Sequence, residues 1–220
     1  MSQAHMTKKE LKEDPFFEEV AHIVDFFRKH QKLLFAIIIV LALAITGIFG
    51  GKAYFKTQNE QASGHFGIAM DYYNKDQLID AEDQFLLLAE QYKRTDWGMR
   101  SYYYLGLVNR GLMKSEEETL EYLELFVNSD LKDPALKASA YQLIGTYYYS
   151  NGDMLSAGEN YLNAAKKVLG TSGKLNLGIR AGEAFIEAED SDKLDSVIRY
   201  LGTLDLNKTE KNRVDVLAKR

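Results

Sequence analysis

Residues 33–51 form the longest uninterrupted apolar stretch of the chain. They lie between Lys32 and Lys52, carry no charged side chain and include Thr46 as their one polar side chain. A helix of this length is about 28 Å long, close to the roughly 30 Å hydrocarbon core of a bilayer. The leader is too long and the apolar run too extended for a typical cleaved signal peptide. The pattern therefore predicts a single transmembrane signal anchor at 33–51.

The segment before this anchor has a helical pattern of its own. Asp14 and Pro15 are typical of a helix start, and apolar residues then recur every three or four positions up to Phe27 among charged ones. We expect residues 1–32 to be a cytoplasmic tail that contains an amphipathic helix, with a disordered polar segment at 1–13. The helix either rests on the lipid interface or docks onto a neighbouring membrane protein.

The orientation of the anchor is predicted from the basic residues on its two sides. Six Lys or Arg residues precede the span, whereas Lys52 and Lys56 are the two just beyond it. The positive-inside rule then leaves the N-terminus in the cytoplasm and places the larger downstream domain outside it. We expect a bacterial inner-membrane protein with an extracytoplasmic domain. The excess is small, so an N-anchored cytoplasmic scaffold for a signalling or division complex stays open.

Beyond a predicted linker at 52–61, helical patterns of about a dozen residues alternate with short turns, which favours an all-α domain at 62–204. The clearest unit reads Tyr141-x2-Ile144-Gly145-x2-Tyr148, followed by a Gly-Asp turn and then by Ala157-x3-Tyr161. This is the tetratricopeptide pattern, in which two antiparallel helices form one repeat.

The same frame recurs on both sides of this unit. Ala69, Gly106 and Gly182 take the place of Gly145, and we expect each small residue to let the two helices of its hairpin approach closely. Aromatic residues at matching positions, Phe185 among them, are expected to fill the space between successive hairpins. The sequence predicts about four tetratricopeptide-like hairpins in an α-solenoid, followed by a capping helix or a tail at 205–220.

Composition and charge narrow the class of function. The 220 residues are 46% hydrophobic, contain no cysteine and carry a formal charge of −5. The lack of cysteine excludes thiolate nucleophiles and zinc knuckles, and the acidic balance argues against a nucleic-acid surface. The chain has no metal-binding histidine pair, nucleophile elbow or phosphate-binding loop. We therefore expect a non-enzymatic protein without cofactor, metal or small-molecule substrate.

A cytoplasmic tail, one anchor and about four tetratricopeptide-like repeats together resemble the YfgM-like bacterial proteins, which are ancillary subunits of the Sec translocon. The resemblance extends from Lys8-Lys9-Glu10-Leu11 through Leu34-Phe35-Ala36-Ile37 to about Leu204. It implies contacts with translocon subunits and with periplasmic chaperones, and a role in helping exported chains emerge. The bilayer itself would be contacted through residues 33–51.

In tetratricopeptide arrays the first helix of each hairpin lines a concave groove. We apply this arrangement to the positions of this chain that have the same helical phase. An aromatic and methionine-bearing groove suits polypeptide segments with apolar side chains. The alternative for each tyrosine is structural packing. The predicted peptide-binding groove consists of Phe66, Met70, Tyr73, Tyr103, Leu107, Arg110, Gln142, Thr146 and Tyr149, with Glu183 and Glu187 from the fourth unit.

Overall fold

The computed structural model describes residues 15–220, and for 15–18 the backbone alone. The predicted polar segment at 1–13 and the helix cap at Asp14 lie outside the described residues. The chain divides into an N-terminal unit that ends at Lys56 and a C-terminal unit that runs from Thr57 to Arg220.

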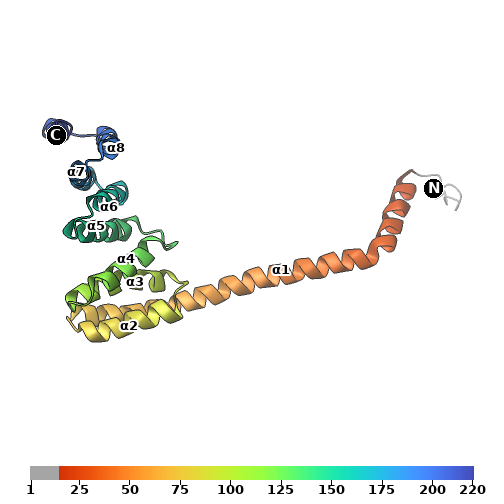
Figure 1. Cartoon of the computed structure of the whole chain (residues 1–220). Coiled ribbons are helices and arrows are strands. Elements are labelled where there is room, and N and C mark those ends of the chain that lie inside the picture. The colour runs from red at the N-terminus through yellow and green to blue at the C-terminus, as the bar shows by residue number, and fades with distance from the viewer. Residues whose placement is uncertain (1–14) are drawn as a thin grey trace, which may run out of the picture. The chain divides into compact units, whose positions relative to one another are not determined.

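The described residues form nine α-helices and no strand (Figure 1). This confirms the all-α prediction. The helices are α1 (Pro15–Asn74), α2 (Leu78–Gln91), α3 (Asp96–Gly111), α4 (Glu116–Val127), α5 (Pro134–Ser150), α6 (Met154–Lys167), α7 (Thr171–Glu187), α8 (Ser191–Gly202) and α9 (Lys208–Leu217).

Within the N-terminal unit, α1 carries the predicted apolar span as one unbroken helix. Among the described residues, α1 is the one helix that is long and apolar enough to cross a membrane, and none of its most apolar stretch is buried by protein. The hydroxyl of Thr46 donates a hydrogen bond to the carbonyl oxygen of Ala42 at 2.8 Å. Its polar group is thereby satisfied inside the helix, as a hydrocarbon environment requires.

The helix continues through residues 52–61, which we had assigned to a linker. Its last part, from Thr57 onward, belongs to the C-terminal unit and forms the first helix of the first hairpin. There Ala62, Phe66 and Ala69 are buried against Phe85 of α2 and Leu105 of α3. The first hairpin therefore needs no separate helix start, because α1 supplies its first helix.

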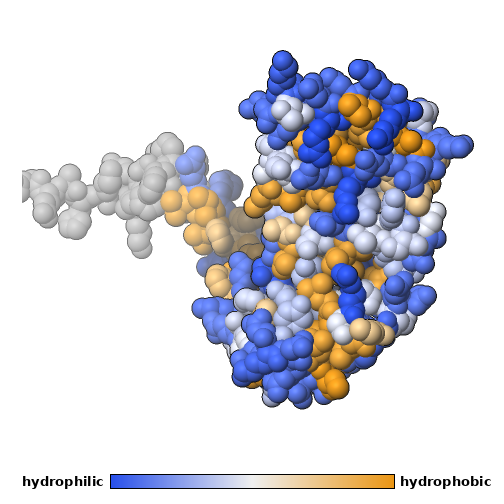
Figure 2. Space-filling view, turned by 90° about the vertical axis from the view of Figure 1, so that its left-hand side faces the viewer, coloured by the Kyte–Doolittle hydropathy of each residue, from blue (hydrophilic) through white to orange (hydrophobic). Residues whose placement is uncertain are grey.

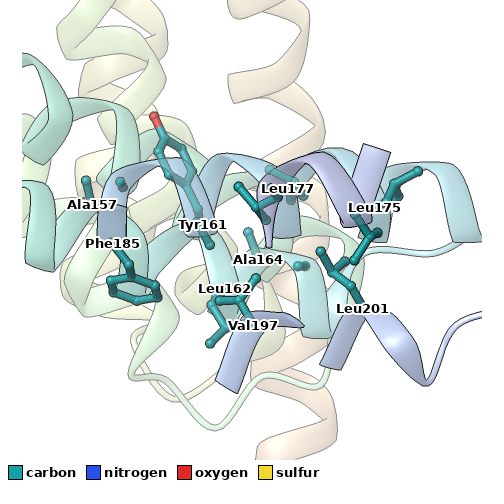
Figure 3. Close-up of a cluster of buried hydrophobic side chains, with 14 of the residues drawn as sticks. Ala157, Tyr161, Leu162, Ala164, Leu175, Leu177, Phe185, Val197 and Leu201 are labelled. Carbon is teal, nitrogen blue, oxygen red and sulfur yellow. The ribbon is translucent and has the colours of Figure 1, made fainter. Parts of the chain in front are cut away.

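The C-terminal unit is a row of helices in which each packs on the next from α2 to α8 (Figure 1). Short turns join consecutive helices, so neighbours run antiparallel. Three buried clusters follow one another along the row, the largest lying between α6, α7, α8 and α9 (Figure 3). Because each helix buries its apolar stripe against its immediate neighbours, the core is a series of clusters along the row and not one central cluster.

Close approach between helices depends on glycines that face large side chains. A Cβ on Gly145 of α5 would lie 2.9 Å from the ring of Tyr161 on α6, and one on Gly106 of α3 would lie 2.9 Å from Leu123 on α4. Both contacts join the two helices of one hairpin, as predicted. Gly158 of α6 faces the buried ring of Phe185 on α7, which fills the space between two hairpins, also as predicted.

The fourth hairpin departs from the predicted frame. A Cβ on Gly182 would meet Leu217 of α9, at 2.6 Å, and not the partner helix α8. Gly178, one turn earlier, is the residue that faces α8, with a Cβ 2.5 Å from Leu201. The prediction for Gly182 was wrong because a further helix packs on this side of α7.

That further helix resolves the two alternatives for residues 205–220. Asn207 caps α9 by accepting a hydrogen bond from the backbone N–H of Glu210, whose side chain accepts in return from the backbone N–H of Asn207. Val214 and Leu217 are buried against the last hairpin. The end of the row is thus covered by a short capped helix, which shields α7 from water.

We predict that Gly158→Ala destabilises the C-terminal unit by about 1–3 kcal/mol, because its Cβ would lie 2.5 Å from the buried ring of Phe185. Gly67→Ala is the matched control, since Gly67 is an exposed helical glycine with nothing within 4 Å of its Cβ position. That change should stabilise by roughly 0.4–1 kcal/mol. Denaturant unfolding of the full chain in detergent, followed by helicity, measures both, and equal effects would contradict the packing argument.

Candidate functional site

A cleft of about 660 Å³ lies between the second and third hairpins. Leu120 and Leu123 of α4 and Leu143 of α5 supply apolar wall, and Tyr147 adds an aromatic ring. Gln142 and Thr146 of α5 are exposed at the same cleft. The cleft therefore joins an apolar surface to groups that can hydrogen bond with a peptide backbone.

Cations surround this cleft. Arg110 and Arg180 line it, both exposed, and Lys114 lies in the turn between α3 and α4. Lys114 forms a salt bridge with Glu82 of α2, in which the ammonium nitrogen lies 2.6 Å from each carboxylate oxygen. No salt bridge between described residues involves Arg110 or Arg180, so both guanidinium groups can meet a bound anion.

A second cleft of about 440 Å³ lies next along the row and shares Arg180 with the first. The guanidinium of Arg180 lies 5.3 Å from the ring centre of Tyr161, whose hydroxyl donates to the hydroxyl oxygen of Thr146 at 3.2 Å. These contacts tie α5, α6 and α7 together at the boundary between the clefts. Glu183 and Glu187 face Arg180 and Arg220 in the second cleft, so this cleft carries both signs of charge.

Tyr149 belongs to the second cleft. Its hydroxyl donates a hydrogen bond to a carboxylate oxygen of Glu187 at 3.3 Å. The negative charge of Glu187 raises the pKa of Tyr149 above its usual value. Because the ring is 43% exposed and its hydroxyl spans α5 and α7, Tyr149 is available to a bound segment.

The structure divides the predicted groove residues into three groups. Arg110, Gln142 and Thr146 come together at the first cleft, and Tyr149 lies in the second with Glu183 and Glu187. Half-buried packing positions are taken by Met70, Tyr73 and Leu107.

The other two residues, Phe66 and Tyr103, are in the core. Phe66 is 8% exposed and contacts the rings of Phe85 and Trp97. Tyr103 is 7% exposed, packs on Phe126 and shares a 2.9 Å hydrogen bond with the hydroxyl of Ser139. For Tyr103 the structural-packing alternative describes its place, and neither residue lines the two clefts described above.

The sequence reasoning missed Leu120, Tyr147 and Arg180. Arg180 lies about one turn before Glu183 on α7 and therefore on the same helical face as Glu183 and Glu187. Extending the predicted face by one turn would have included it. Leu120 lies on the second helix of its hairpin, whereas the prediction considered first helices alone. Tyr147 was not placed because it falls within a run of three tyrosines, from which the phase selected Tyr149.

No group of three or more metal-ligating side chains occurs among the described residues. The chain matches no family model, no curated protein and no solved structure. The resemblance to YfgM-like proteins therefore stays a prediction.

We predict that Glu187→Gln lowers the pKa of Tyr149 toward its ordinary value near 10, because the substitution removes the neighbouring carboxylate charge. Glu183→Gln is the control, since Glu183 raises the same pKa least among the groups around it. NMR titration of ring-labelled tyrosine, assigned with Tyr149→Phe, measures both shifts. A larger effect from the control would contradict the contact between Tyr149 and Glu187.

Proposed function

We propose that this chain is a membrane-anchored, polypeptide-binding protein whose C-terminal unit is a tetratricopeptide-like solenoid. The proposal is carried by one observation, the pair of adjacent clefts that share Arg180. Apolar wall, exposed amide and hydroxyl groups, and cations beside carboxylates occur there within neighbouring hairpins. Such a mixture suits an extended or helical segment with apolar and charged side chains.

The repeat assignment rests on recurring packing. Gly106 with Leu123 and Gly145 with Tyr161 place a small residue of the first helix against a large one of the second in two successive hairpins. Ala69 and Phe85 occupy the same frame in the first hairpin, and both are fully buried. A repeated small-to-large contact at matching positions supports one supersecondary unit used several times.

The membrane assignment rests on the exposed apolar span in α1. Twelve of the residues at 33–51 are Leu, Ile, Val or Phe, each of which favours insertion by roughly 0.3–0.6 kcal/mol near the bilayer centre. The excess of Lys and Arg before the span supports a cytoplasmic N-terminus. The C-terminal unit would then lie on the extracytoplasmic side of a bacterial inner membrane.

The partner follows from these two parts together. A polypeptide-binding unit held at the extracytoplasmic face is well placed to meet chains as they leave a translocon. We therefore propose an accessory of the Sec translocon that contacts translocon subunits, periplasmic chaperones or emerging chains, as the YfgM-like resemblance implies. Its binding chemistry uses side chains already present in the clefts and requires no cofactor.

The topology is tested with Met113→Cys. Met113 is 92% exposed in the turn between α3 and α4, and the chain has no other cysteine. We expect a membrane-impermeant maleimide to label this variant in intact cells, with the cysteine-free chain as blank and a cytoplasmic thiol protein unlabelled. Labelling that requires lysis would reverse the topology and favour the cytoplasmic scaffold.

The clefts are tested by placing a photo-crosslinking amino acid at Gln142, which is exposed at the first cleft. We expect crosslinks in cells to an arrested exported chain or to translocon subunits. The same amino acid at Gln91, the exposed last residue of α2 and outside both clefts, is the control and should give at least about tenfold less product. Equal yields from the two positions would remove the clefts from the proposal.

A further inference from the structure

The turns of the C-terminal unit gather at two opposite edges, because neighbouring helices are antiparallel. At one edge Lys114, after α3, pairs with Glu82 at the start of α2. At the other edge Arg100, near the start of α3, pairs with Asp133, the N-cap of α5, at 2.9 Å. Side-chain contacts thus connect successive turns along each edge.

The two edges carry opposite charge. The first, here called the acidic edge, comprises the turns at 74–80, 112–118, 151–153 and 187–192. Its ten acids outnumber its two cations, Lys75 and Lys114. The acids are Asp76, Asp80, Glu116, Glu117, Glu118, Asp153, Glu187, Glu189, Asp190 and Asp192. The second, here called the basic edge, comprises the turns at 92–96, 128–133, 166–174 and 203–207. Its cations are Lys93, Arg94, Lys132, Lys166, Lys167 and Lys174 against Asp96, Asp130, Asp133 and Asp205.

Helix dipoles account for only part of this separation, since Asp80, Glu116 and Asp192 lie in first turns and Lys166 and Lys167 in a last turn. Acidic side chains are favoured at helix starts and basic ones at helix ends. At the acidic edge the even-numbered helices α2 to α8 begin and the odd-numbered helices α1 to α7 end. At the basic edge the order is reversed: α3, α5 and α7 begin there, and the even-numbered helices end there. Each edge therefore presents starts and ends together, and the dipoles alone do not fix the sign of an edge.

The cations of the basic edge are available. Lys93, Arg94, Lys132 and Lys166 are exposed, and no salt bridge between described residues involves them. Burial and the neighbouring ammonium of Lys167 lower the pKa of Lys137, which lies beside this edge. The cations of this edge also outnumber its aspartates.

An apolar side chain stands among these cations. Leu169, in the turn between α6 and α7, is 75% exposed and directly follows Lys166, Lys167 and Val168. A leucine beside lysines is the combination that enters the boundary between lipid headgroups and acyl chains.

The chain also enters the C-terminal unit at the basic edge. Asn59, near the first residue of the unit, accepts a hydrogen bond from the backbone N–H of Asp96 at 3.2 Å. His65 contacts the ring of Tyr92, in the turn before α3. The first residues of the C-terminal unit, which continue α1, therefore lie against a turn of the basic edge.

We propose that the basic edge is a docking surface for anionic phospholipid headgroups of the membrane that holds α1. Its lysines meet phosphate groups, Leu169 enters the interface, and the acidic edge is left for the aqueous side. The inference uses the anchor of the proposed function and does not depend on the clefts.

An anionic bilayer is favoured over an acidic protein partner because it is tethered to this edge. Asn59, which contacts this edge, lies eight positions after Gly51, the end of the apolar span, so a short covalent tether raises the effective concentration of the lipid surface. Each lysine near an anionic surface then strengthens contact, and salt weakens it.

The test uses the full chain reconstituted in phosphatidylcholine vesicles with or without phosphatidylglycerol. Ser172→Cys and Ser191→Cys place a polarity-sensitive fluorophore at exposed helix starts on the basic and acidic edges, respectively. In vesicles that contain phosphatidylglycerol, we expect the emission of the fluorophore on the basic edge to shift to shorter wavelength and to be quenched by headgroup-labelled lipid. The fluorophore on the acidic edge should show neither change. Co-flotation with the vesicles reports separately on the anchor.

Charge variants make the test specific. Lys132→Gln with Lys166→Gln should lower the docked-to-undocked ratio at least about tenfold. Lys75→Gln with Lys219→Gln changes the net charge equally off the basic edge and should leave the ratio unchanged. A chain that floats with the vesicles while the basic-edge fluorophore does not respond overturns the docking proposal alone and leaves an acidic protein as the partner. A chain that does not float overturns the anchor and the docking proposal together.

Discussion

Close contact between a small residue on one helix and a large side chain on the next is the interaction on which the C-terminal unit depends. A single amphipathic hairpin cannot bury its apolar face, so stability comes from the packing of each helical hairpin against the next. Gly145 against Tyr161 and Gly158 against Phe185 set this spacing within and between hairpins. Tyr161 and Phe185 are labelled in Figure 3. Any side chain in place of either glycine would separate layers that have no second core to rely on.

The same contact decides which aromatic residues are free to bind. Phe66 and Tyr103 fill interhelical space and are almost fully buried, whereas Tyr149, one turn beyond the packed region of α5, is exposed. The proposed binding surface therefore lies where the packing ends, in clefts lined by leucines and polar side chains. In Figure 2 apolar side chains of this unit accordingly appear as patches between hydrophilic ones.

The sequence alone was sufficient for features that repeat or that have few physical alternatives. An uncharged stretch of this length predicts a helix that can span a bilayer, and spaced glycines with aromatics predict stacked hairpins. Features that depend on one particular packing neighbour could not be predicted from the sequence. Nothing local reveals that α1 continues through 52–61, or that Leu217 of α9 occupies the space facing Gly182. Six of the eleven residues predicted for the groove line the two clefts, because helical phase gives a face of a helix but not what packs on it.

A one-dimensional stack also explains why charge could separate toward the two edges. In a deep globular core, turns cross one another and their charges must be paired or distributed, whereas here the turns of the row stay at its two edges and contact mainly the adjacent hairpin. Arg100 with Asp133 and Lys114 with Glu82 are such contacts between adjacent hairpins. Packing thus constrains the small and aromatic positions and leaves the turns free to vary. Selection for a surface can then act on the edges without cost to the core, so charged turns are where the partners of such a protein are best sought.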